Sequence, residues 1–199
     1  MPSLHKGARE LRASIKCMNP APNLFLIGPM GAGKTTIGRR LAEQLQLPFH
    51  DLDHVIEEQT GATIPLIFEL EGEAGFRRRE CSCLDEMTAL QGIVLATGGG
   101  AVLDPDNRAL LARRGFIVYL ETAVDIQLAR LARDRKRPLL AAPDRRERLE
   151  QMAALRNPLY RSLADLTVIS DNEHAAQVAA DLAQRLALEW QRQPATAAA

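Results

Sequence analysis

The sequence predicts an α/β fold in which a parallel sheet is covered by helices on both faces. Short apolar runs alternate with stretches that carry apolar residues at helical spacing, and the first run leads into a glycine-rich loop. With 199 residues, of which 46% are apolar, the chain is expected to form one compact domain. The expected strands are 24–28, 48–51, 93–97, 116–120 and 166–169.

The glycine-rich loop, GPMGAGKTT, fits the pattern G-x-x-x-x-G-K-[ST] of phosphate-binding loops. Phosphate oxygens approach backbone N–H groups closely where side chains are absent, and the helix expected at 36–47 starts just after the loop. Lys34 supplies a positive charge for the phosphates, and Thr35 offers a hydroxyl oxygen to Mg²⁺. A simple glycine turn would not explain the lysine and threonine together. The expected ATP-binding residues of the loop are Gly31, Ala32, Gly33, Lys34, Thr35 and Thr36.

Two aspartates, Asp51 and Asp53, stand at the end of the second strand in HDLD. If the extended geometry continues to that point, both carboxylates face the same side of the strand. One can then hold Mg²⁺ directly or through water, while the other meets a substrate hydroxyl. The alternative is that Asp53 caps a helix beginning near His54, and capping does not exclude catalysis.

The long helical region 55–91 contains FRRRE, in which Glu80 follows Arg77 by three residues. This spacing lets the glutamate orient the guanidinium for a bidentate grasp of a carboxylate, although most such pairs are solvated surface features. The third strand then ends in TGGGAV, where backbone amides at 98–100 can meet a ligand without obstruction. The alternative for these glycines is an ordinary turn.

The segment 130–148 holds eight basic and three acidic residues, and prolines at 138 and 143 interrupt any helix. A solvated loop is one interpretation of this segment. Beside a phosphate-binding loop, the other is a lid that closes over ATP, excludes water and brings an arginine to the transferring phosphoryl group.

The composition argues against several classes of partner. Basic and acidic residues number 25 each and aromatic residues make up 4%, which disfavours binding to nucleic acid or to an anionic membrane. No apolar run is long enough to span a bilayer. Three cysteines are too few for a disulfide framework, and Cys81 and Cys83 should point to different faces of a helix. We expect a cytoplasmic monomer with reduced thiols.

Five motifs in order, GPMGAGKTTIGRRLA, DLDHVIEEQTGATIPLIFELEGEAGFRRRE, TGGGAV, RPLL and RNPLY, resemble those of shikimate kinases over about residues 24–169. The resemblance implies a three-layer P-loop kinase fold, similar to nucleoside monophosphate kinases, with a five-stranded parallel sheet of order 2-3-1-4-5. The single domain would span 24–190, with a substrate-binding helical region at about 53–91 and a lid at about 132–146. Residues 1–23 would form an extension, flexible or a short helix, and 191–199 a disordered tail.

The resemblance also implies a reaction and its residues. ATP would phosphorylate the 3-hydroxyl of shikimate, giving shikimate 3-phosphate and ADP, the fifth step of chorismate biosynthesis. The implied catalytic residues are Lys34, Asp53 and Arg137, and the implied Mg²⁺ ligands are Thr35 and Asp51. The implied shikimate-binding residues are Asp53, Arg77, Gly99 and Arg156, with Glu80 in support. Arg137 would reach the ATP phosphates and Arg130 would flank the adenine.

Two alternatives remain open on the sequence. Another small-metabolite kinase, such as a gluconate kinase, is disfavoured by the arginines of FRRRE and RNPLY and by TGGGAV. A ligand sensor that keeps the kinase fold without turnover would need an output domain, for which 23 residues before the first strand are too few. The segment SDNEHAA after the last strand matches the family poorly, so the sequence does not specify its adenine contacts.

Overall fold

A computed structural model describes residues 21–132, 144–171 and 174–190. Its sheet has five strands in the order β2-β3-β1-β4-β5, and all paired strands are parallel. The predicted fold class and strand order are therefore confirmed. The strands are β1 (Asn23–Ile27), β2 (Phe49–Asp51), β3 (Val94–Ala96), β4 (Gly115–Glu121) and β5 (Leu166–Ile169).

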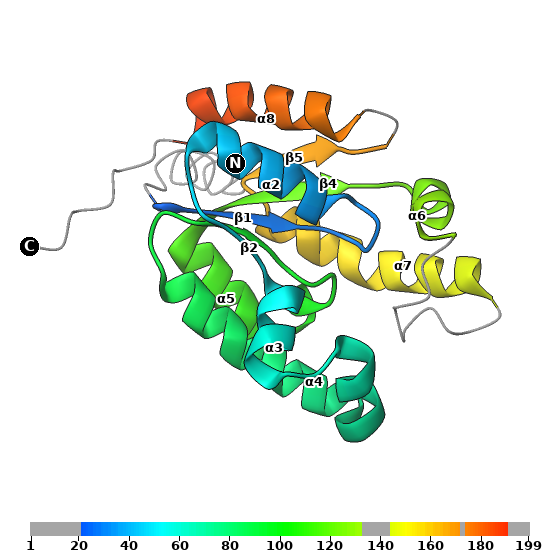
Figure 1. Ribbon diagram of the computed structural model, residues 1–199. Coiled ribbons are helices and arrows are strands. Elements are labelled where there is room, and N and C mark those ends of the chain that lie inside the picture. Colours follow the sequence, from blue (N-terminus) through cyan, green and yellow to red (C-terminus); the bar gives the residue numbers. More distant parts are fainter. Residues whose placement is uncertain (1–20, 133–143, 172–173, 191–199) are drawn as a thin grey trace, which may run out of the picture.

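Helices cover both faces of the sheet (Figure 1). On one face lie α2 (Lys34–Leu45) and α8 (Ala175–Glu189). The other face is covered by α4 (Ile64–Ala89), α5 (Pro105–Arg114) and α7 (Arg145–Leu163), and α6 (Val124–Leu131) lies beyond the end of β4. The remaining elements are α3 (Leu52–Thr60) and a 3₁₀ turn, η1 (Ala101–Leu103). Among the described residues, no helix combines the length and apolar character needed to cross a membrane.

The core consists of two layers that the central strands supply in alternation. In β1, Leu24 and Leu26 join the cluster with α2 and α8, whereas Phe25 and Ile27 join the cluster with α4 and α5. Successive side chains of a strand point to opposite faces, so a strand covered on both sides must be apolar throughout. This explains why the central strands are uninterrupted apolar runs in the sequence.

The register brings the functional loops to one edge of the sheet. Asp51 at the end of β2 pairs with Ala96 of β3, which in turn pairs with Leu26 of β1. The loops that follow these three strands therefore begin side by side at the carboxyl edge, where ligands bind in open α/β sheets.

The region 55–91 forms two helices, with a further break inside the second. Gly61 ends α3 with a φ of 66°, and Gly72 interrupts α4 with φ and ψ of 67° and −177°. Both conformations favour glycine, and the helical spacing of apolar residues does not reveal them. The break at Gly72 separates a short N-terminal part of α4 from the part that carries Arg77 and Glu80.

The start of the domain is fixed by Asn23, whose side chain is 1% exposed. Its Nδ2 donates to the carbonyl oxygens of Thr88 and Leu90, and its Oδ1 accepts from the backbone of Ile93. Asn23, which we assigned to the extension, is thus tied to the end of α4 and the start of β3.

Candidate active site

The loop after β1 has the backbone that its glycines permit. Gly28, Gly31 and Gly33 have φ values of 143°, 77° and 88°, which L side chains rarely adopt. At Gly28 a Cβ atom would also lie 2.6 Å from the carbonyl oxygen of Leu120 in β4. The first glycine is therefore required both by its dihedral angles and by the neighbouring strand.

Two cations hold this loop. Lys34 Nζ donates to the carbonyl oxygens of Gly28 and Pro29, both at 2.8 Å, so its ammonium group lies against the loop itself. Arg130 of α6 donates to the carbonyl oxygen of Gly31 at 2.9 Å and to that of Asp171, just after β5, at 2.7 Å. Arg130 thus joins the phosphate-binding loop to the segment that follows the last strand.

Asp51 connects β2, α3 and the loop. Thr35 Oγ1 donates to Asp51 Oδ2 at 2.6 Å, and the backbone N–H of Asp53 donates to Asp51 Oδ1 at 3.1 Å. Asp51 is therefore the N-cap of α3. Our alternative that Asp53 caps the helix is wrong, and so is the premise that extended geometry continues to Asp53. Capping by Asp51 starts the helix at Leu52 and places Asp53 in its first turn.

The oxygens of Thr35 and Asp51 fit a magnesium site. Both are hard oxygen donors, and Mg²⁺ commonly takes only one or two protein ligands while it keeps several waters. The Thr35 hydroxyl donates its hydrogen bond to Asp51, which leaves the lone pairs of the hydroxyl oxygen available to a cation. In the described part of the chain, histidine, cysteine and acidic side chains form no cluster of three or more that could hold a metal.

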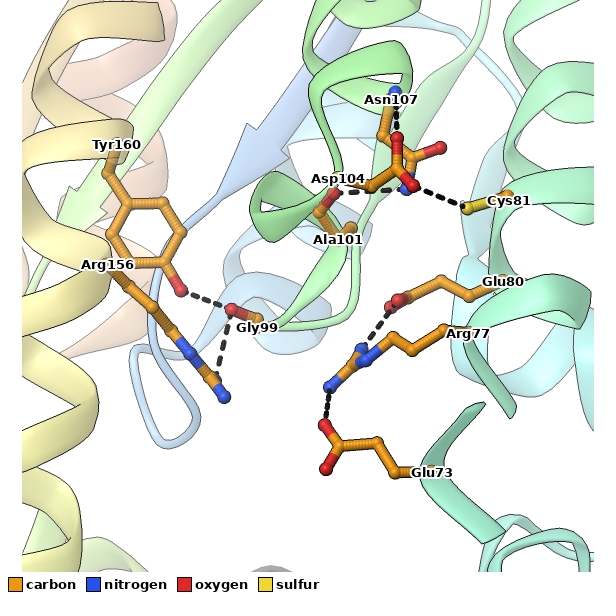
Figure 2. Close-up of polar contacts among 10 residues, drawn as sticks. All are labelled: Glu73, Arg77, Glu80, Cys81, Gly99, Ala101, Asp104, Asn107, Arg156 and Tyr160. Atoms are coloured by element: carbon orange, nitrogen blue, oxygen red, sulfur yellow. Dashed lines mark hydrogen bonds and ion pairs between the residues drawn. The ribbon is translucent and has the colours of Figure 1, made fainter. Parts of the chain in front are cut away.

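Arg77 and Glu80 form a mostly buried ion pair on α4, as their spacing predicts (Figure 2). Arg77 Nη1 donates to Glu80 Oε2 at 2.5 Å, and the Glu80 side chain is 1% exposed. Burial raises the pKa of Glu80, and the charge of Arg77 opposes that rise. Arg77 Nη2 donates to Glu73 Oε1 at 3.1 Å. This pair is not the solvated surface feature that we considered as the alternative.

Each glycine of TGGGAV accommodates a different part of the site. A Cβ atom on Gly98 would lie 2.5 Å from Glu80 Oε1 and 3.1 Å from Asp53 Oδ1. On Gly99 it would meet the backbone of the phosphate-binding loop at 3.4 Å, and on Gly100 it would lie 2.3 Å from Arg77 Nη1. The absence of a Cβ atom at Gly98 and Gly100 therefore lets Glu80 and Arg77 pack against this loop, whereas a Cβ atom at Gly99 would make an ordinary contact.

Arg156 of α7 faces the same space as Arg77 from the opposite side (Figure 2). Its side chain is 7% exposed, and Nη1 donates to the carbonyl oxygen of Gly99 at 3.2 Å. Tyr160, one turn further along α7, donates its hydroxyl to the same oxygen. Among the described residues Arg156 forms no ion pair and its Nε has no hydrogen-bond partner. Burial lowers the pKa of Arg156, and the charge of Arg77 lowers it further.

Two residues of the site were not predicted from the sequence. Glu73 contacts Arg77, and its position four residues earlier on a helix is a signal that could have identified it. Tyr160 contacts Gly99 although 61 residues separate them, and no local pattern reveals such a contact. Arg137 and most of the expected lid lie outside the described residues.

Cys81 and Cys83 of α4 have different surroundings, as their spacing predicts. Cys83 is buried in the core. Cys81 is partly exposed, and its Sγ lies 3.6 Å from Asp104 Oδ2 (Figure 2). Burial raises the pKa of both thiols. They take no part in the site.

Comparison with known proteins identifies the relatives of this chain. A family model described as shikimate kinase matches residues 30–187. A shikimate kinase of Stenotrophomonas maltophilia (strain R551-3) is 59% identical over 90% of the chain and all of its own length. A solved structure, a shikimate kinase from Acinetobacter baumannii in complex with shikimate, superposes with a TM-score of 0.83 at 46% identity, covering 88% of this chain and 97% of that one. The resemblance found in the motifs is confirmed, and the chain belongs to the shikimate kinase family.

Proposed function

We propose that the chain transfers the γ-phosphoryl group of ATP to the 3-hydroxyl of shikimate, giving shikimate 3-phosphate and ADP. The observation that carries the proposal is the pair formed by Arg77 and Arg156, two mostly buried arginines that face one space next to a phosphate-binding loop. The A. baumannii relative, which was solved with shikimate, supports the same substrate.

The carboxylate of shikimate binds between the two arginines in this proposal. Arg156 carries a buried positive charge with no acidic partner among the described residues, and a buried charge gains most from a bound counter-ion. Arg77 is held by Glu80, so its guanidinium is oriented before the substrate arrives. Arg156 and Tyr160 both donate to the carbonyl oxygen of Gly99. The backbone held in this way contacts the substrate between the two arginines.

Transfer of the phosphoryl group relies on residues at the carboxyl edge of the sheet. Lys34 exchanges the carbonyl oxygens of Gly28 and Pro29 for phosphate oxygens of ATP, which hold a cation more strongly. Asp53, whose carboxylate lies beside Gly98, receives the proton of the substrate hydroxyl. We assign Arg130 to the nucleotide side because it bridges the loop and the segment after β5. Arg137 is assigned to the ATP phosphates from its motif alone.

Mg²⁺ would be held by Thr35 and Asp51. When bound, the ion neutralises charge on the phosphates of ATP. The contribution of the chain is to keep the two oxygens adjacent: the hydrogen bond from Thr35 to Asp51 orients both, and the N–H of Asp53 fixes the carboxylate from the other side.

We propose further that the protein works as a cytoplasmic monomer that does not bind nucleic acid. The use of ATP and the free thiols at Cys81 and Cys83 support a reducing, ATP-containing compartment. The balance of 25 basic and 25 acidic residues supports the absence of a nucleic-acid partner. Light scattering after gel filtration tests the monomer, since a mass well above 21.9 kDa would contradict it.

The decisive experiment measures ADP release in the presence of ATP and Mg²⁺ with shikimate, with gluconate and with no acceptor. We expect release that depends on shikimate. Tight shikimate binding without ADP release would instead indicate a ligand sensor. Turnover with gluconate alone would show that the substrate pocket has been misassigned.

A further inference from the structure

Arg77 is shared by two carboxylates that differ in how firmly they are held (Figure 2). Glu80 binds Nη1 and its side chain is 1% exposed. Glu73 binds Nη2 at 3.1 Å and its side chain is 51% exposed. The first carboxylate is part of the interior, whereas the second lies at the solvent boundary.

The position of Glu73 in α4 also allows its side chain to move away from Arg77. It directly follows Gly72, whose dihedral angles interrupt α4, so the helical backbone does not continue rigidly on its N-terminal side. A half-exposed carboxylate that gives up an ion pair is solvated by water, and such pairs contribute little stability. Releasing Glu73 therefore costs little free energy, whereas releasing Glu80 would leave a buried charge without a partner.

The hydrogen-bond donors of Arg77 indicate which contact of a ligand Glu73 would oppose. The guanidinium carries two N–H groups on each terminal nitrogen and one on Nε. Glu80 accepts from Nη1 and Glu73 accepts from Nη2, so a ligand carboxylate that approaches Nη2 competes with Glu73 for this nitrogen. The charge of Glu73 is also felt by Arg156, whose pKa it raises in opposition to the larger effect of burial. A negative ligand between the two arginines would thus compete with Glu73 for Nη2 and would also meet the like charge of Glu73.

We propose that Glu73 is a counter-ion that Arg77 exchanges for the carboxylate of the acid substrate. Without substrate, Glu73 accepts a hydrogen bond from Nη2. When the substrate carboxylate binds, Glu73 moves into solvent and the substrate takes its place. The exchange lowers the affinity for the acid by the free energy of the lost Glu73 contact. A ligand without a carboxylate does not displace Glu73. This inference rests on the proposed function, because it takes Arg77 as a shikimate-binding residue.

The test is calorimetric binding of shikimate to the full chain without nucleotide. We compare wild type, Glu73→Gln, Glu73→Ala and the control Glu69→Gln, which removes the same charge at an exposed position of α4 before Gly72. Both Glu73 variants should bind shikimate about two- to fivefold more tightly than wild type, as expected for removal of a partly exposed ion pair. The control should match wild type, and all four proteins should bind the methyl ester of shikimate equally.

Several results would overturn the inference. Weaker binding of shikimate by both Glu73 variants would show that Glu73 positions Arg77 for the substrate. Unchanged binding would make Glu73 a bystander, and equal tightening for the methyl ester would indicate a loosened pocket and not a released donor. ADP release by wild type separates this inference from the proposed function: turnover of shikimate without tightening in the variants refutes the counter-ion exchange alone.

Discussion

Replacing Arg156 by methionine should separate substrate binding from stability. The substitution Arg156→Met keeps a long apolar side chain in the buried position and removes the guanidinium. The guanidinium makes one hydrogen bond, to Gly99, while its Nε has no partner in the described structure. The variant therefore loses one hydrogen bond within the protein, and it also removes one buried N–H donor that has no acceptor.

The two effects on stability nearly cancel. A hydrogen bond that involves a charged group contributes about 1.5–3 kcal/mol, and leaving a buried polar group unsatisfied costs about 1–3 kcal/mol. The free energy of unfolding should then change by no more than about 2 kcal/mol in either direction. Binding has no such compensation, because loss of a charge-assisted hydrogen bond to the substrate carboxylate corresponds to an affinity about 10- to 150-fold lower.

Two measurements decide the outcome. Urea unfolding without ligand gives the change in stability, and calorimetry with shikimate, followed by steady-state kinetics, gives the change in affinity and in KM. A drop in unfolding free energy above about 2 kcal/mol with unchanged shikimate affinity would show that Arg156 has a structural role, which would refute our reasoning.

The remaining predictions concern four other positions. Arg77→Met strands the buried Glu80, so unfolding should cost about 3 kcal/mol less at neutral pH. Burial raises the pKa of Glu80 and Arg77 opposes that rise, so removing Arg77 should raise this pKa further. The stability deficit of the variant should therefore shrink in urea titrations as pH falls and Glu80 takes up a proton, and it should grow as pH rises. Asp53→Asn should lower kcat about 100-fold or more if Asp53 accepts the proton, and near-normal turnover would leave it as a positioning residue. Gly98→Ala places a methyl group 2.5 Å from Glu80 Oε1 and should cost about 1–3 kcal/mol in thermal or urea unfolding; an unchanged midpoint would contradict this packing. Thr35→Val should raise the Mg²⁺ concentration for half-maximal activity about tenfold or more, and an unchanged requirement would remove Thr35 from the metal site.

The sheet and its loop could be predicted because their signals are local. A strand buried on both faces must be apolar along its whole length, which makes β1 and β4 visible as uninterrupted runs. Lys34 and Thr35 follow the glycines at a spacing set by the turn into α2. The order of the strands is not local information, and it came from the resemblance of several motifs to one family.

The geometry around the acidic residues could not be predicted in the same way. Asp51 and Asp53 are both suitable N-caps, and the choice depends on where β2 stops pairing with β3. The need for glycine at 98 and 100 arises from side chains on α4, which reach the loop only in the folded chain. Arg156 likewise lies in a helix whose sequence does not show that this one arginine is buried.

The site must remain stable without substrate and must also attract an acid, and its two arginines meet these two requirements separately. A pocket in which every cation were neutralised by protein carboxylates would hold its shape but would not attract an acid. A pocket of unpaired buried arginines would attract an acid but would be unstable without it. Arg77 has two carboxylate partners, which orient its guanidinium for the substrate. Arg156 has no acidic partner among the described residues, so its charge attracts the substrate carboxylate. Of the two partners of Arg77, only the exposed Glu73 can leave with a small loss of stability. Substrate binding can therefore give Arg156 a carboxylate partner without breaking the buried pair of Arg77 and Glu80.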